Sequence, residues 1–255
     1  MQHPLVTHFF DEPTNTFSYI VRDPDSSACA IIDSVLDFDY AAGRTDVRSA
    51  DKIIEYVQSN DLSVEWVLET HVHADHLSAA PYLHERLGGK TGIGEKIAVV
   101  QEVFGKAFNA GTDFARDGSQ FDRLFKEGDT FMIGNLEASV LHTPGHTPAC
   151  LTYVIGDAAF VGDTLFAPDA GTARCDFPGG DAHTLYHSIQ KVLALPEKPA
   201  FSYAMTTKRR GAMSLFMRRP SPSNVPATSM WATISVKTSL LFFAQSVTPS
   251  SECPD

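Results

Sequence analysis

The sequence predicts a mixed α/β sandwich, because short strands occur in pairs and helices are interleaved with those pairs. Strand patterns at 17–22 and 28–32 flank a turn-rich segment, and a helical pattern follows at 49–59. Further strand pairs surround the turn residues at 134–135 and 156–157. Strand pairs between helices are typical of a sandwich and not of a doubly wound parallel sheet.

Two kinds of signal predict the individual elements. Helices are predicted where apolar residues recur at helical spacing, as Ile53, Ile54 and Val57 do after the capping-type residue Ser49. Strands are predicted where short apolar runs lie between turn residues. In chain order, the predicted elements are strands 17–22 and 28–32, helix 49–59, strand 64–69, helix 79–87, strands 130–133, 136–141, 151–155 and 158–161, and helix 182–195.

Composition limits the possible functions. The chain has 255 residues, 43% hydrophobic and 20% charged, which is enough for one large core. Its net charge of -11, without a long run of Lys or Arg, argues against nucleic acid as a partner. The apolar stretches are too short to span a bilayer, and the N-terminus lacks a secretory signal pattern. We therefore expect a cytoplasmic protein, without a membrane partner, whose four cysteines are free thiols.

The strongest chemical signal is a run of metal-ligand residues directly after the predicted strand 64–69. His71, His73, Asp75 and His76 lie within six positions. A strand end followed by a tight loop can direct several imidazoles and a carboxylate to one point, and both groups bind zinc or iron. This motif therefore predicts a metal site.

Three further residues extend the pattern, each after a predicted strand. Asp33 follows the strand 28–32, His146 lies in a Thr-Pro-Gly-His-Thr turn, and Asp163 follows the strand 158–161. Taken alone, a strand-end Asp is usually a cap or a turn former. In this order, the residues together strengthen the prediction of a metal site.

The order Asp, HxHxDH, His, Asp resembles the metallo-β-lactamase superfamily over residues 5–201. The resemblance implies a four-layer αβ/βα sandwich. Within the superfamily, the chain is similar to the persulfide dioxygenases and to the glyoxalase II thioester hydrolases. The dioxygenases hold one Fe(II), and the resemblance places His71, His146 and Asp163 as its ligands. Two His and one carboxylate are also the ligand set expected of a non-haem iron oxygenase.

The other motif residues have two possible roles under this resemblance. In the hydrolases they hold a second metal, and in the dioxygenases they orient the ligands by hydrogen bonds. They are His73, Asp75 and His76. We expect Asp75 and His76 to be catalytic as well as metal-associated.

The segment 171–177 favours the dioxygenases. It resembles their Gly-x-x-Arg-Thr/Cys-Asp-Phe stretch, which makes Arg174 and Asp176 candidate catalytic residues that support the site and glutathione binding. A guanidinium offers a fixed fork of donors to a substrate carboxylate. The alternative is an ordinary loop ion pair. We do not expect Cys175 to act as a nucleophile.

The leading functional hypothesis is an enzyme that oxidises glutathione persulfide to sulfite with O2, using one Fe(II) per chain. The second is a zinc-dependent thioester hydrolase, in which a metal-bound hydroxide attacks the carbonyl. The third is a metal-binding remnant without turnover. A homodimer is compatible with all three.

The chain departs from the family after residue 201. The family's Cys-His-Asp-Tyr turn is absent, and no His follows His187. When each codon of 202–207 is started one base early, however, the allowed products include Leu-Cys-His-Asp-Tyr. Segments 227–231 and 243–249 permit family-like residues in the same register. We therefore divide the chain into a metallo-β-lactamase-fold domain, 1–201, and a tail, 202–255, expected to be an out-of-frame product with poor order.

Overall fold

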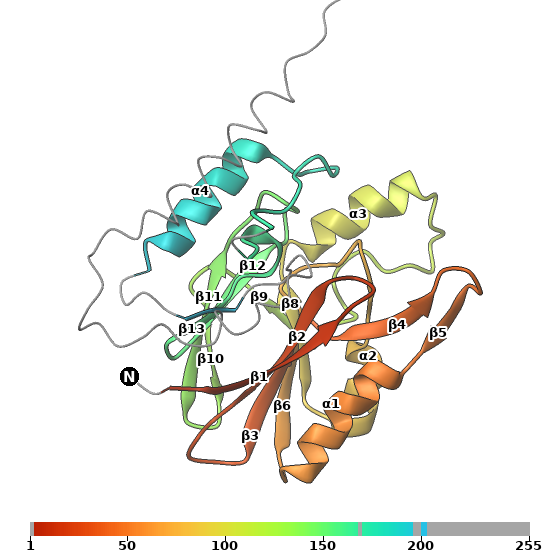
Figure 1. Ribbon diagram of the computed structural model, residues 1–255. Coiled ribbons are helices and arrows are strands. Elements are labelled where there is room, and N and C mark those ends of the chain that lie inside the picture. The colour runs from red at the N-terminus through yellow and green to blue at the C-terminus, as the bar shows by residue number, and fades with distance from the viewer. Residues whose placement is uncertain (1–2, 168–169, 196–199, 203–255) are drawn as a thin grey trace, which may run out of the picture.

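A computed structural model describes residues 3–167, 170–195 and 200–202, so all but the first residue of the expected tail, 202–255, lies outside the described part. Two sheets pack face to face, and helices cover the outer face of each sheet (Figure 1). This arrangement confirms the expected αβ/βα sandwich.

The first sheet has six strands in the order β1-β2-β3-β6-β8-β9. β1, β2 and β3 are antiparallel neighbours, whereas β3, β6, β8 and β9 run parallel. The bounds are β1 Leu5–Asp11, β2 Thr16–Arg22, β3 Ala28–Ile32, β6 Ser63–Leu68, β8 Lys90–Gly94 and β9 Arg123–Phe125. The parallel β3 and β6 end at the same edge of the sheet, where Asp33 and Glu69 follow them.

The second sheet has five strands, in which β10 to β13 are antiparallel and β14 pairs parallel with β13. A small third sheet contains β5, β4 and β7. The bounds are β10 Thr130–Ile133, β11 Leu136–His142, β12 Leu151–Ile155, β13 Ala158–Phe160, β14 Ala200–Ser202, β4 Val35–Asp39, β5 Arg44–Asp46 and β7 Leu77–Ser78.

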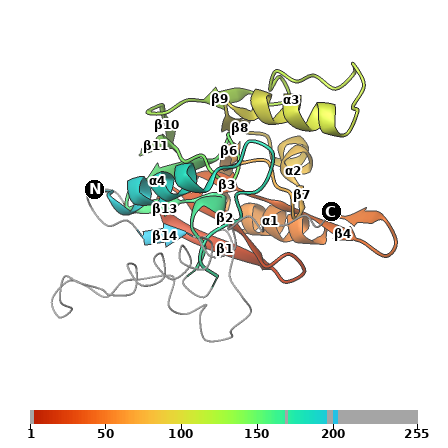
Figure 2. The ribbon, with the colours of Figure 1, turned by 90° about the horizontal axis from the view of Figure 1, so that it is seen from above.

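Four α-helices complete the described part, and Figure 2 shows them around the sheets from above. α1 and α2 pack on the first sheet, α3 packs beside β8, and α4 packs on the second sheet. The bounds are α1 Arg48–Ser59, α2 Ala80–Leu87, α3 Ile97–Ala107 and α4 Ala182–Leu193, with a 3-10 turn η1 at Gly162–Thr164. In the residues that the structure describes, no helix is long and apolar enough to cross a membrane.

One local prediction is wrong. Ser49 does not cap α1, which begins at Arg48 and has no side-chain cap. The backbone N–H and the hydroxyl of Ser49 instead donate to the carboxylate of Asp37, at 2.7 and 2.8 Å. Ser49, which was expected to cap the N-terminus of α1, therefore ties α1 to β4 instead.

The main core lies between the two sheets and positions the loops that carry the site. Its fully buried aromatic residues are Phe125, Tyr153 and Phe160. Tyr153 also donates its hydroxyl proton to the main-chain oxygen of Glu69 at 3.0 Å, which joins β12 to the end of β6. Because both sheets are fixed against this core, the loops from both sheets meet at one edge of the sandwich.

Candidate metal centre

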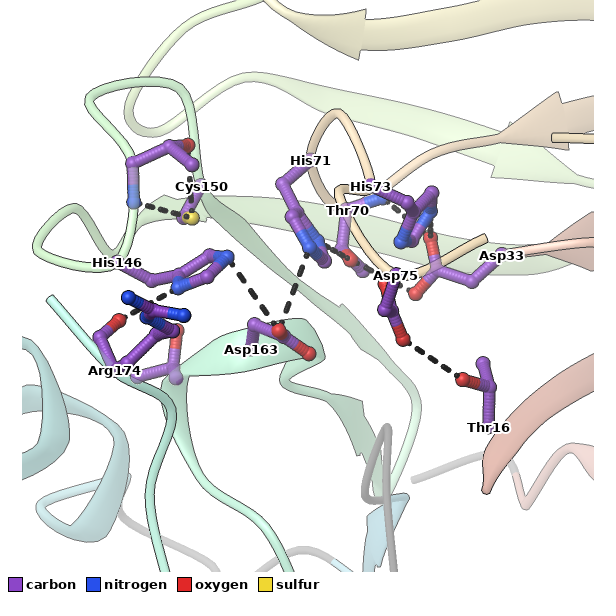
Figure 3. Close-up of polar contacts among 12 residues, drawn as sticks. Thr16, Asp33, Thr70, His71, His73, Asp75, His146, Cys150, Asp163 and Arg174 are labelled. Atoms are coloured by element: carbon purple, nitrogen blue, oxygen red, sulfur yellow. Dashed lines mark hydrogen bonds and ion pairs between the residues drawn. The ribbon is translucent and has the colours of Figure 1, made fainter. Parts of the chain in front are cut away.

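The three expected first-site ligands come together at this edge, as Figure 3 shows. His71 lies in the loop after β6, His146 in the loop between β11 and β12, and Asp163 in η1. Their ligand atoms lie within 4.8 Å of one another. One oxygen of Asp163 lies 3.7 Å from Nε2 of His71 and 3.5 Å from Nε2 of His146.

Hydrogen bonds select the ring nitrogen that each histidine offers. Thr70 donates its hydroxyl proton to Asp33 at 2.8 Å, and it accepts the Nδ1 proton of His71 at 3.0 Å. His146 donates its Nδ1 proton to the main-chain oxygen of Arg174 at 2.7 Å. Because Nδ1 carries the proton in both rings, Nε2 keeps a free lone pair.

The turn that carries His146 is fixed from both sides. The N–H and the hydroxyl of Thr147 contact the buried sulfur of Cys150 at 3.3 and 3.1 Å. On the other side, Gly145 has a φ of +137°, and a Cβ there would lie 2.4 Å from the backbone of Leu185 in α4. The imidazole of His146 is therefore placed by a rigid turn packed against a helix.

The electrostatics favour neutral imidazoles at this point. Burial lowers the pKa of His71 well below its ordinary value, and the charge of His73 adds to the effect. Burial likewise lowers the pKa of His146. Burial, together with the charge of Asp75, raises the pKa of Asp163 to about 7. A cation among these groups would oppose the shift of Asp163, because it stabilises the carboxylate.

A second group lies beside the first and contains His73, Asp75 and His76, whose ligand atoms also lie within 4.8 Å of one another. His76 donates its Nδ1 proton to the main-chain oxygen of Leu77 at 3.1 Å, and burial lowers its pKa to about 4. Asp75 accepts a hydrogen bond from the hydroxyl of Thr16 at 3.2 Å. The motif therefore supplies a second set of possible ligands.

His73 differs from the other three histidines. Its Nε2 lies 2.7 Å from a carboxylate oxygen of Glu69 and 3.4 Å from Asp33. Burial alone lowers the pKa of His73, but these two carboxylates overcome it and raise the pKa well above the ordinary value. Glu69 was not among the predicted site residues, because a Glu at the end of an apolar strand carries no motif signal.

The donor set fits a metal ion. Nε2 of His71 and Nε2 of His76 are buried and have no hydrogen-bond partner in the part of the chain that the structure describes. A buried ring nitrogen without a partner is costly unless something else satisfies it. Imidazole nitrogens with a carboxylate are the ligands that zinc and iron prefer.

Arg174 and Asp176 lie outside both ligand groups. Their exposed side chains form a two-point ion pair, with both N–O distances at 2.6 Å. The guanidinium also lies over the ring of Phe177, which in turn lies edge-on to His146 at 5.2 Å. The ion pair that the sequence left open as an alternative is therefore present, and a catalytic role for these two residues remains a prediction.

The profile of the Metallo-beta-lactamase superfamily matches residues 11–200. The chain belongs to this superfamily. It is 59% identical over 201 residues to a probable metallo-hydrolase of Burkholderia pseudomallei, covering 75% of this chain and 68% of that protein. It is 55% identical over 194 residues to a beta-lactamase hydrolase-like protein of Agrobacterium fabrum, covering 76% of this chain and 45% of that protein.

Two named enzymes are also similar. Glyoxylase B2 of Dictyostelium discoideum is 52% identical over 71% of this chain and 63% of its own length. Human mitochondrial persulfide dioxygenase ETHE1 is 29% identical over 75% of this chain and 64% of its own length. Among solved structures, ETHE1 from Myxococcus xanthus has a TM-score of 0.63 and 28% identity, covering 81% of this chain and 77% of that one. The chain thus spans between about half and two thirds of most of these relatives.

Proposed function

We propose that the chain is a non-haem Fe(II) enzyme that oxidises glutathione persulfide to sulfite and glutathione with O2. The observation that supports this most is the group of His71, His146 and Asp163, in which a carboxylate and two imidazoles with pKa lowered by burial converge. This is the ligand set of the non-haem iron oxygenases. The likeness to human persulfide dioxygenase ETHE1 and to the solved structure of ETHE1 from Myxococcus xanthus adds to it.

The reaction breaks the S–S bond and oxidises the terminal sulfur, which gains two oxygen atoms from O2 and one from water. When bound, iron supplies open positions for O2 and for a thiolate sulfur. The protein holds Nε2 of His71 and Nε2 of His146 free through Thr70 and the main-chain oxygen of Arg174. The Arg174 guanidinium is exposed beside Phe177, and in this proposal it receives a glutathione carboxylate in exchange for Asp176.

The test is the metal content of the purified full-length chain, followed by O2 uptake with glutathione persulfide after loading with Fe(II). We expect about one iron per chain, as a single set of three ligands requires. With glutathione persulfide, sulfite should be released in step with O2 uptake. Asp163→Ala should abolish both. Iron-loaded protein that consumes no O2 with this substrate would overturn the proposal.

A zinc-dependent thioester hydrolase is the second candidate. The buried, unpartnered Nε2 of His76 and its neighbours His73 and Asp75 favour a second metal. The likeness to glyoxylase B2 is in line with that chemistry. About two zinc ions per chain and hydrolysis of a glutathione thioester would support this candidate. Absence of any tightly bound metal would instead mean that the chain has lost its metal site.

A further inference from the structure

Glu69 is a buried carboxylate to which the proposed reaction gives no part. It directly follows β6, and its exposed fraction is 3%. One carboxylate oxygen lies 2.7 Å from Nε2 of His73, and the other accepts the hydroxyl proton of Ser78 at 2.5 Å. Burying a carboxylate costs free energy unless both of its oxygens accept hydrogen bonds, and in Glu69 both oxygens do.

The carboxylates of Asp33 and Glu69 each orient a different histidine. Asp33 accepts the N–H and the hydroxyl of Thr70 at 2.7 and 2.8 Å, and Thr70 in turn orients His71. Its contact with Nε2 of His73 is longer, at 3.4 Å. Glu69 is therefore the main acceptor for His73, while Asp33 serves mainly His71.

The ring of His73, a member of the second ligand group, contacts a histidine of each group. It stacks on His76 at 4.1 Å and lies edge-on to His71 at 4.2 Å. A hydrogen bond at one ring nitrogen decides which nitrogen is left for other contacts. Since Nε2 is held by Glu69, Nδ1 is the nitrogen that remains for the centre.

We propose that Glu69 is a positioning residue that holds Nε2 of His73, so that Nδ1 of His73 faces the metal centre. The role is indirect, because Glu69 acts on the centre through His73. It depends on metal binding at this centre and not on which of the two reactions the protein performs, so its test uses no activity measurement.

The first measurement is the zinc affinity of the full-length chain, by competition with a chromogenic chelator. We expect Glu69→Ala to weaken zinc binding about 10- to 100-fold, the usual effect of removing a carboxylate behind a metal-ligating histidine. Glu69→Gln keeps an oxygen that accepts the same proton and should restore most of the affinity. Ser78→Ala is the matched control, because it removes the other hydrogen bond of Glu69 and leaves His73 in place.

The second measurement follows the ring directly, by nitrogen-15 NMR of the histidines in the zinc-loaded chain. We expect a hydrogen-bonded Nε2 proton of His73 in the unaltered protein and in Glu69→Gln, but not in Glu69→Ala. Unchanged zinc affinity in a folded Glu69→Ala, or an equal loss in Ser78→Ala, would overturn the proposal. If Glu69→Ala does not fold, Glu69→Gln decides: a folded variant that has lost the His73 signal overturns the proposal, and one that keeps it supports the proposal.

Discussion

The hydroxyl of Thr70 decides which nitrogen of His71 is free to bind a metal. It donates to Asp33 and accepts from Nδ1 of His71, so the ring keeps its proton away from the centre. We expect Thr70→Val to weaken metal binding about 10-fold or more, because the Nδ1 proton loses its acceptor. Thr70→Ser keeps the hydroxyl and should bind metal nearly as the unaltered chain does. Chelator competition measures both, and equal affinity in the Val and Ser variants would contradict this account.

The buried thiols of Cys29 and Cys150 are expected to be unreactive in the folded protein. Burial raises the pKa of Cys29 and of Cys150 to about 12. Only the thiolate reacts with iodoacetamide, and at pH 8 about one in ten thousand such thiols is ionised. We therefore expect both residues to stay unmodified in the native protein and to react after denaturation, as mass spectrometry of the peptides will show. Rapid labelling of native Cys150 would mean that the turn around His146 opens readily.

The sequence predicts the metal ligands better than the residues that hold those ligands in position. His71, His146 and Asp163 were predicted as ligands from the superfamily's residue order, and the structure brings the three together. Glu69 was not predicted, because its role depends on the pairing of β3 with β6 and on the rotation of a histidine four residues away. Contacts of this kind are set by tertiary structure, and spacing along the chain does not record them.

Gly145 shows how an element supports the centre. Its φ of +137° disfavours a side chain, and a Cβ would lie 2.4 Å from the backbone of Leu185 in α4. We expect Gly145→Ala to lower the free energy of unfolding by about 2 kcal/mol or more, because helix and turn must separate. Gly128→Ala is the matched control: its φ is +79°, nothing lies within 4 Å, and about 1 kcal/mol is expected. Urea unfolding measures both, and equal losses would show that α4 does not press on the turn.

The predicted elements were found where periodicity was strong. The strand patterns at 17–22 and 28–32 match β2 and β3, and the helix at 182–195 matches α4 to within two residues at its end. α3 was not predicted, because the consecutive apolar run at 97–100 obscures the helical spacing of its buried residues Ile97, Val100 and Gln101. Several strands were also missed, namely β1, β4, β5, β7, β8, β9 and β14. Of these, β5 and β7 have only three and two residues, which give too little pattern.

At the scale of the whole molecule, the centre joins the two halves of the sandwich. His71 follows a strand of the first sheet, whereas His146 and Asp163 follow strands of the second. A metal that binds only the folded chain should therefore stabilise it, by about 2.7 kcal/mol at 100 times the dissociation constant. We expect the melting temperature to rise by several degrees on adding Fe(II) or Zn(II) to the chelated protein. An unchanged melting temperature would mean that the folded chain does not bind the metal.

The abrupt end of the family likeness leads to the last prediction. The superfamily profile stops at residue 200, and the codons possible for the residues just beyond it permit the missing Cys-His-Asp-Tyr turn when read one base early. In that register, Met205 followed by Thr206 necessarily encodes Asp, because ATG precedes AC. We expect the gene to carry codons for 202–207 that read Leu-Cys-His-Asp-Tyr one base early. Codons incompatible with that reading would exclude a frameshift.

The same hypothesis predicts how a chain with the reading frame restored would bind metal. A chain corrected after Phe201 would regain the His that the family uses at its second metal position, beside the group that His73, Asp75 and His76 already form. It should bind more metal per molecule than the chain as it stands, measured side by side by elemental mass spectrometry. Equal metal content in both chains would mean that the three described residues suffice, or that this position stays empty. A Zn(II) titration distinguishes these outcomes, because only an empty position leaves the second equivalent weakly bound.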